Sequence, residues 1–580
     1  MKKLFIIILL IIGIFFRSYQ PGLYIFGFDQ VQILTNAELI KQGNMTLIGP
    51  RTGPAEMFTG PLIYYITALF LFVFGSPWSI VATSTLIAAF TGFSLFYLIR
   101  KYISIESALV ALIIWTFSPF LIRFDRIAWN PDLTFLASSL VFFPMLGYLK
   151  QKKVSSVDLI LIFIGSFLGF QAHFSGLLLP VMLFLTLVVF KKFSIKLMLV
   201  SGLGLATSIL PSLIFDYRHG WLNARGLISF LSEKETIGGT LFFGRFVHSL
   251  QMASEIFGSF SPFELERNVS IYLGLLFLSI VIWKFAKKQV ENYTNTAVSF
   301  FWVSTVIVIF SFYRSNAPEY YFFIFLPALF VFASDLLEPN KKIMNFQKSL
   351  IILILSILSF YSIINFESIV HIDSPKVNSQ LNIARDIASH NTRDPIAKVA
   401  YDILEVDTIG MRYFIDKLVT LSDVGKTVHI SQTNDKNTRY DQYGLWLDPR
   451  TEQGFQYIVS NDVVLKMPEN IRLLEDRYQG AKYGPHESFQ IASNDELTGD
   501  ILVLVRYIGN PFIVGNETFP NLKKHVTQKE TENGWKPINF ESYSGYLKEY
   551  ENYILVYVTD KTPIELYEIS ALSIKPGILY

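Results

Sequence analysis

Cysteine is absent from the 580-residue sequence. Its absence excludes disulfide bonds, thiolate metal sites and cysteine nucleophiles. Charged residues are also scarce, at 17%, and the net charge is only +2. The chain has no basic run or RNA-binding motif, so we expect no nucleic-acid partner. No small-residue cleavage site follows the first apolar segment, MKKLFIIILLIIGIFF, because RSYQPG comes next. We therefore interpret that segment as a retained membrane span and not as a signal peptide.

Apolar residues are abundant instead. The sequence is 51% hydrophobic and 16% aromatic, which is more apolar than an average soluble domain. The excess is organised in repeated apolar runs of about 15–22 residues, long enough to cross the hydrocarbon core of a bilayer. We therefore predict a polytopic α-helical protein of the cell membrane, surrounded by membrane lipids.

The positions of lysine and arginine indicate which ends of these runs face the cytoplasm, because short cytoplasmic loops carry an excess of both residues. Lys2 and Lys3 place the N-terminus inside, and later basic loops divide most of the remaining runs into pairs. This pattern predicts about eleven transmembrane helices, with the N-terminus inside and the C-terminus outside. The predicted spans are 4–18, 78–99, 106–122, 133–149, 157–172, 175–190, 196–214, 270–286, 297–312, 321–337 and 349–365.

The segment PLIYYITALFLFVFG (61–75) is apolar but does not fit this count. A full span here would place Arg100 and Lys101 outside, so we predict a helix lying along or dipping into the outer face. The alternative is twelve spans and a cytoplasmic C-terminus; the charge pattern favours eleven.

The composition changes after about residue 366, where the apolar runs shorten. We predict a transmembrane domain over 1–366, with a first outer loop at 19–77, and an extracytoplasmic soluble α/β domain over 367–580, divided into two lobes near 500. Local patterns within the second domain predict helices at 378–390 and 407–419 and strands at 397–404, 500–508, 551–560 and 564–576.

Compact polar clusters lie next to the span ends on the predicted outer face. Their members are Asp29 and Arg51; Arg123, Asp125, Arg126 and Asp132; Gln171 and His173; Asp216, Arg218 and His219; and Arg314, Glu319, Tyr320 and Tyr321. Ionisable groups at membrane depth are costly and indicate a functional site. Clusters in five outer loops predict one outward-facing cavity.

Each residue also has a purely structural interpretation. Asp29 and Asp132 could be helix caps, and His173 could be a packing residue in a tight hairpin. The arginines could extend toward lipid headgroups, and Glu319 could pair with Arg314. The functional interpretation depends on the coincidence of polar clusters in five loops.

These residues suit the transfer of a group carried on a lipid phosphate. The phosphate requires arginine or lysine, and the acceptor requires a carboxylate that removes its proton. Asp29, at the start of an amphipathic stretch beside the membrane, is the candidate base.

The order of motifs resembles a known family. One span is followed by an acid that opens an outer helix, then by GPLIYY leading into ALFLFVFG, a further span, and a Pro-Asp pair after the next loop. Over about residues 1–215 this resembles the GT-C membrane glycosyltransferases, in particular the protein mannosyltransferases and the lipid A aminoarabinose transferase.

The resemblance implies an inverting transfer from a polyprenyl- or dolichyl-phosphate sugar. It implies that Asp29 is the catalytic base and that Asp132 is a second active-site acid. The family often has a basic residue before Pro-Pro-Leu, whereas this chain has FTGPLIYY, so the donor phosphate would bind Arg126, Arg218 or Arg314. Some members bind a divalent metal, for which His173 with Asp216 or His219 is the candidate set.

We therefore predict an extracytoplasmic glycosyltransferase with an unidentified acceptor. The predicted pocket contains Asp125, His173, Asp216, His219, Glu319 and Tyr320. A transporter or flippase of lipid-linked sugars, or an O-antigen-type polymerase or ligase, is the alternative. A transporter would require a polar path to the inner face and inverted repeats, and neither is evident.

Overall fold

The computed structural model describes most of the membrane region and parts of the region that follows it. The described residues are 2–52, 57–232, 242–259, 267–286, 293–313, 317–337, 360–361, 363–365, 376–392, 395–402, 405–422, 424–433, 454–465, 482–483, 488–508, 513–514, 523–530, 538–557 and 564–574.

The chain forms two compact units. One contains Met1–Leu421 and Lys426–Asp462, and the other contains Ser422–Gly425 and Val463–Tyr580. The first unit thus includes elements beyond residue 366. The predicted domain boundary at 366 and the division near 500 remain predictions.

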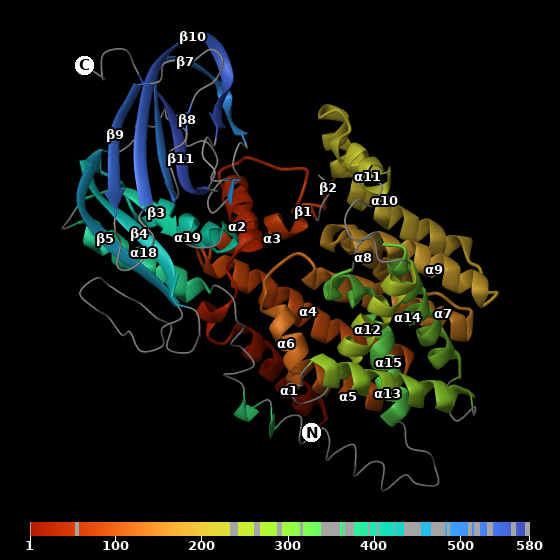
Figure 1. The fold of residues 1–580 in the computed structure, drawn as a ribbon. Coiled ribbons are helices and arrows are strands. Elements are labelled where there is room, and N and C mark those ends of the chain that lie inside the picture. Colours follow the sequence, from red (N-terminus) through yellow and green to blue (C-terminus); the bar gives the residue numbers. More distant parts are fainter. Residues whose placement is uncertain are drawn as a thin grey trace. The chain divides into compact units, whose positions relative to one another are not determined.

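The N-terminal part of the first unit is almost entirely helical (Figure 1). Its α-helices are α1 (Lys2–Ser18), α2 (Phe28–Lys41), α3 (Leu62–Leu71), α4 (Trp78–Tyr102), α5 (Ile105–Phe117), α6 (Pro119–Asp125), α7 (Asp132–Gln151), α8 (Ser156–Ala172), α9 (Leu178–Val189), α10 (Ile195–Arg218), α11 (Leu222–Ser232), α12 (Phe242–Gly258), α13 (Arg267–Ala286), α14 (Tyr293–Ser311) and α15 (Leu326–Leu337). Three 3-10 helices, η1 (Pro21–Leu23), η2 (Phe174–Leu177) and η3 (Glu319–Phe325), and a small hairpin of β1 (Arg51–Thr52) and β2 (Met57–Phe58) complete it.

Helices occur at ten of the eleven predicted spans, and the eleventh, 349–365, lies almost wholly outside the described residues. Four described helices are long and apolar enough to cross a membrane, and the pair α5 and α6, bent by 63°, is a fifth if it forms one span. The protein is therefore a polytopic membrane protein. Helix α3 has ten residues and is about 15 Å long, too short to cross a core of about 30 Å.

Helix α12 lies between the predicted spans 196–214 and 270–286, where no buried helix was expected. It packs against α13, α14 and η3, and it buries Met252, Ala253, Ile256 and Phe257 in the main hydrophobic core. These residues recur at the spacing of one helical face, while polar residues occupy the other face. The segment therefore contains no continuous apolar run.

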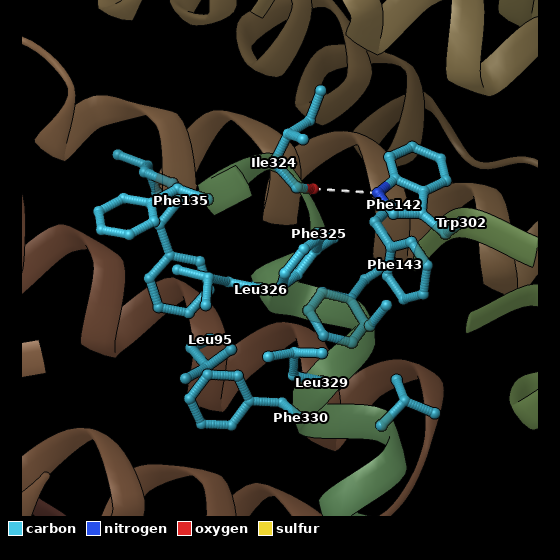
Figure 2. Close-up of a cluster of buried hydrophobic side chains, with 14 of the residues drawn as sticks. Leu95, Phe135, Phe142, Phe143, Trp302, Ile324, Phe325, Leu326, Leu329 and Phe330 are labelled. Atoms are coloured by element: carbon cyan, nitrogen blue, oxygen red, sulfur yellow. Dashed lines mark hydrogen bonds between the residues drawn. The ribbon is translucent and has the colours of Figure 1, made fainter. Parts of the chain in front are cut away.

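Helix α7 lies at the centre of this bundle, and nearly all of its residues are buried. Figure 2 shows the packing around it: Phe135 stacks on Phe330 at 5.6 Å between ring centroids, and Phe142 meets Trp302 edge-on at 5.2 Å. The indole of Trp302 donates a hydrogen bond of 3.0 Å to the carbonyl of Ile324. This packing fixes the helix whose first residue is Asp132.

The α/β elements after the membrane region begin with α18 (Val377–Asn391), β3 (Ile396–Asp402), α19 (Glu405–Leu418), β4 (Val424–Thr433) and β5 (Gly454–Leu465). Strands β3 and β4 are parallel, with Val399 opposite Val428, and the strand order is β3-β4-β5. Helix α19 connects the two parallel strands, as a crossover requires. The predicted helices at 378–390 and 407–419 and the strand at 397–404 are confirmed.

The second unit contains an antiparallel sheet. Its strands are β6 (Lys482–Tyr483), β7 (Ser488–Ile508), β8 (Ile513–Val514), β9 (Lys523–Glu530), β10 (Ile538–Tyr557) and β11 (Ile564–Ile574). The order is β6-β11-β7-β10-β8, with β9 also paired to β10. The predicted strand 500–508 falls within β7, and the predicted strands 551–560 and 564–576 overlap β10 and β11, with their last residues outside the described ranges.

Replacing Trp302 tests the packing around α7. Trp302→Ala should lower the free energy of unfolding by about 3–5 kcal/mol, because it leaves a large cavity and leaves the Ile324 carbonyl without its donor. Thermal unfolding of the detergent-solubilised protein measures this change. Phe5→Ala, at a 48% exposed residue of α1, is the control and should have little effect.

Candidate active site

The connection between α1 and α2 is held by a buried arginine. Arg126 is fully buried, and its guanidinium donates to the carbonyls of Phe16, Arg17, Tyr19 and Gln20 at 2.8–3.3 Å. Two of these carbonyls end α1, where a helix leaves acceptors unsatisfied and attracts cations. These carbonyls engage both terminal nitrogens of Arg126, whereas its Nε is buried without a hydrogen-bond partner. A structural role thus accounts for its position, and its role in phosphate binding remains a prediction.

A second buried arginine accounts for Asp125. Arg17 forms an ion pair with Asp125, donates to the carbonyls of Gly13 and Trp115 at 3.0 and 2.8 Å, and lies 4.1 Å from the Trp115 ring centroid. Asp125 therefore balances a buried charge, and its predicted place in the pocket remains a prediction.

Asp132 belongs to the same buried region. It is 6% exposed, and one carboxylate oxygen accepts a hydrogen bond from Ser84 of α4 at 3.2 Å. Ser84 also donates to the carbonyl of Asp125. The other oxygen of Asp132 is buried without a well-formed hydrogen bond. Asp132 thus connects α4 and α7 beneath the loop 126–131.

Asp29 has a different environment from these acids. It is the second residue of α2, whose N-cap is Gly27, so the interpretation of Asp29 as the N-cap is wrong. Its side chain is half-buried, and among the described residues no hydrogen bond or ion pair engages its carboxylate. Burial raises the pKa of Asp29 above its usual range, while the helix N-terminus favours negative charge.

Three segments meet around the start of α2. Gln30 accepts from the backbone of Gly27 at 3.0 Å and donates to the carbonyl of Ile127 at 2.7 Å, which joins α2 to the loop 126–131. Asn130 of that loop donates to the carbonyl of Ala172 and so joins it to the end of α8. The first three predicted outer loops are therefore linked by hydrogen bonds.

Gln171 ties the third loop to α3 and α10. Its carbonyl oxygen accepts from the backbone of Leu62 at 3.0 Å, and its amide donates to Ser208. A β-carbon on Gly60 would come within 2.1–2.3 Å of the Gln171 amide group. The glycine in FTGPLIYY is thus required by packing.

Aromatic side chains surround this junction. Burial, and to a lesser degree the nearby carboxylate of Asp29, raises the pKa of the Tyr64 and Tyr320 hydroxyl groups. The ring of Tyr320 packs against Trp129 at 4.7 Å and against His173 at 5.4 Å. Residues from the first, second, third and fifth predicted outer loops thus meet near Asp29.

His173 is a packing residue in this cluster. Its Nδ1 accepts from the backbone of Ser175 at 3.1 Å, and its ring lies 4.4 Å from that of Tyr321. Burial lowers the pKa of His173 to about 3. The imidazole is therefore neutral near pH 7 and supplies no positive charge to a phosphate.

The fourth loop contacts the first at a different place. Both carboxylate oxygens of Asp216 accept from backbone amides at the start of α11, at 2.9 and 3.0 Å, so Asp216 caps that helix. Asn223 of α11 accepts from the backbone of Phe58 at 2.7 Å. Arg218 and His219 are exposed at the end of α10, where His219 stacks on Phe215.

The remaining predicted site residues lie in the fifth loop or outside the described residues. Arg314 is among the latter, and Glu319 is half-exposed at the start of η3. No group of three or more histidine and acidic side chains within the described ranges could hold a metal ion. Of the candidate metal set, His173 contacts Ser175 and Tyr321, Asp216 caps α11, and His219 stacks on Phe215.

Four residues of this junction were missed or under-used by the sequence interpretation: Gln30, Tyr64, Trp129 and Asn130. Trp129 and Asn130 belong to the quoted stretch RFDRIAWNPD, and Tyr64 to GPLIYY, but only ionisable residues were selected there. Polar amides and aromatics beside span ends were thus an available signal. Gln30 had no such signal, since its partner lies in another loop.

Comparisons with known proteins agree with this architecture. No protein-family model and no curated protein sequence matches the chain. Among solved structures, the chain is similar to ArnT from Cupriavidus metallidurans bound to undecaprenyl phosphate, with a TM-score of 0.51 and 11% identity over 80% of this chain and 98% of ArnT. For ArnT in the apo state the TM-score is 0.51, with 12% identity over 79% and 97% of the two chains.

The arabinofuranosyltransferase AftD from Mycobacteria also matches, with a TM-score of 0.36 and 8% identity over 99% of this chain and 62% of AftD. The similarity to ArnT shows that this multi-pass membrane protein has the GT-C fold. The fold expected from the motif order is confirmed.

Arg126→Lys tests the structural role of this arginine. Lysine cannot reach four carbonyls, so stability should fall by roughly 1.5–3 kcal/mol for each carbonyl left without a charged donor. Thermal unfolding measures the loss, with the exposed Arg218→Lys as the matched control. Normal stability of Arg126→Lys, combined with weakened binding of a polyprenyl phosphate, would instead indicate a phosphate ligand.

Proposed function

We propose that this protein is an integral-membrane, inverting glycosyltransferase that moves a sugar from a polyprenyl-phosphate donor to an acceptor on the extracytoplasmic face. The observation that carries the proposal is the state of Asp29: a half-buried carboxylate without a described partner, at a junction of four loops. The GT-C fold and the similarity to a structure that contains undecaprenyl phosphate support it.

The proposed reaction uses Asp29 as the general base. Its carboxylate takes the proton of an acceptor hydroxyl while the acceptor oxygen attacks the anomeric carbon. The bond from that carbon to the phosphate oxygen breaks, the lipid phosphate leaves with the electron pair, and the sugar configuration inverts. Positive charge near the phosphate stabilises this leaving group; we propose Arg218 and Arg314 for that role.

The other acids do not compete for the role of base. Asp125 balances Arg17, Asp216 caps α11, and Asp132 accepts from Ser84. We propose that Asp132 acts beneath the site by holding the start of α7 and the loop that carries Trp129. Tyr320, His173 and Glu319 are proposed to line the pocket. Burial and the nearby Asp29 carboxylate raise the pKa of Tyr320.

Replacing the proposed base tests this assignment directly. Asp29→Asn should reduce transfer by about 100- to 10,000-fold without loss of folded protein. The assay offers a panel of polyprenyl-phosphate sugars to the purified protein and detects product by mass spectrometry. Glu106→Gln, an exposed acid in the first turn of α5, is the matched control; wild-type turnover by Asp29→Asn would refute the role of base.

The pH dependence of transfer is a second test. A general base acts only when deprotonated, and burial raises the pKa of Asp29. Activity should therefore decline on acidification through a pKa above the value of about 3.9 for an exposed aspartate. Values of kcat/KM, obtained from initial rates between about pH 4 and pH 8 with protein that remains folded, measure this acidic limb of the pH profile. An acidic limb at or below the ordinary aspartate value would contradict a buried base.

A further inference from the structure

The segment that leads into α2 is held from two sides. Arg126 binds the carbonyls at its beginning, and α18, more than 350 residues later in the chain, binds its end. The backbone N–H of Val377 donates to the carbonyl of Tyr24 at 3.1 Å. The side-chain amide of Gln380 donates to the carbonyl of Phe26 at 2.7 Å.

The contact between Gln380 and Phe26 is closely packed. Both side chains are 0% exposed, and the ring of Phe26 stacks on Phe414 of α19 at 4.7 Å. A β-carbon on Gly410 of α19 would come within 2.2 Å of the Gln380 side-chain oxygen and 2.7 Å of the Phe26 carbonyl. Only glycine at 410 therefore allows α19 to approach this closely.

Helix α2 is also held along its length. Tyr413 of α19 donates to the Glu38 carboxylate at 2.7 Å, and Lys417 forms an ion pair with the same carboxylate. Asp29 lies between the contact at Phe26 and the contact at Glu38. Its position in the site therefore depends on α18 and α19 as well as on the membrane helices.

From this geometry we propose that α18 and α19 form a brace for α2, and that Gln380 is a positioning residue for Asp29. This inference rests on the proposed function, in which Asp29 is the base. Phe26 precedes Asp29 by only three residues, so loss of the Gln380 hydrogen bond frees the backbone directly before the first turn of α2. Small misplacements of a catalytic group reduce turnover more than binding.

The test begins with Gln380→Met, which keeps the side-chain size and removes the donor. With the full-length protein, kcat should fall about 10- to 100-fold while KM for the lipid donor stays within about twofold. Ser389→Ala, at an exposed residue of α18, is the matched control and should retain wild-type kinetics. Unchanged kcat for Gln380→Met would overturn the proposal.

The pH profile separates positioning from general destabilisation. Tyr64 of α3 and Tyr320 of η3 are the titratable groups near enough to Asp29 to respond to its charge, and no described charged group forms an ion pair with Asp29. A loosened α2 admits water, which returns the pKa of Asp29 toward its ordinary value, so the acidic limb of Gln380→Met should move to lower pH. A loss of stability with an unmoved limb would contradict a positioning role.

A disulfide provides the rescue experiment, because the chain contains no native cysteine. A β-carbon on Gly22 would lie 2.0–2.1 Å from side-chain atoms of Asn378, so Gly22→Cys with Asn378→Cys places two thiols in contact across the brace. We expect oxidation to form this disulfide in the double variant, which carries the two cysteines. In the triple variant, which also carries Gln380→Met, oxidation should raise kcat to within about threefold of the kcat of the oxidised double variant. Reduction should abolish the recovery.

The outcomes distinguish failure of the brace from failure of the proposed glycosyltransferase function. Failure of the cysteines to cross-link, or a cross-linked triple variant that stays slow, overturns the brace. Cross-link formation is read by electrophoretic mobility and does not depend on activity. Absence of transfer by the wild-type protein with every donor refutes the proposed function itself, whatever the cross-linking result.

Discussion

Buried charge and backbone polarity that lack water must find partners within the protein, and the rest of this structure depends on how that requirement is met. Arg126 satisfies the carbonyls at the end of α1 and the start of the next connection, and Arg17 balances Asp125. Together they join α1 to the loop before α7. This arrangement determines where α2 starts, and it gives two arginines a structural role.

The same requirement distinguishes the acids of the outer loops. Partners engage Asp125, Asp216 and one oxygen of Asp132, whereas Asp29 remains without one among the described residues. A carboxylate that is half-buried and unpaired is poorly stabilised by the protein alone, so it retains its capacity to accept a proton. In this chain the hydrogen-bond and ion-pair partners of each acid are therefore a better indication of a candidate base than its presence in a predicted outer loop.

The contacts of α18 and α19 extend this principle beyond the membrane helices. Gln380 gives the Phe26 carbonyl its donor, and Tyr413 and Lys417 engage Glu38 on the same helix. Helix α2 buries an apolar face of its own, formed by Ile33, Leu34 and Ala37. The Phe26 carbonyl before its first turn and its Glu38 side chain depend on α18 and α19 for partners. Packing against α18 and α19 supplies the rigidity that the proposed transfer reaction would require.

The sequence by itself determined the polytopic helical class, the positions of most helices, and the elements α18, β3 and α19, because apolar runs and periodicity are local properties of the chain. It also singled out Asp29. Only the tertiary structure decided that α12 packs within the bundle, that Arg126 caps α1, and that Gln380 binds a carbonyl 354 residues away. The physical reason is the same in each case. The role of a polar side chain or of an amphipathic helix face depends on the partner that the fold brings next to it, and a partner that is distant in the sequence leaves no local sequence pattern.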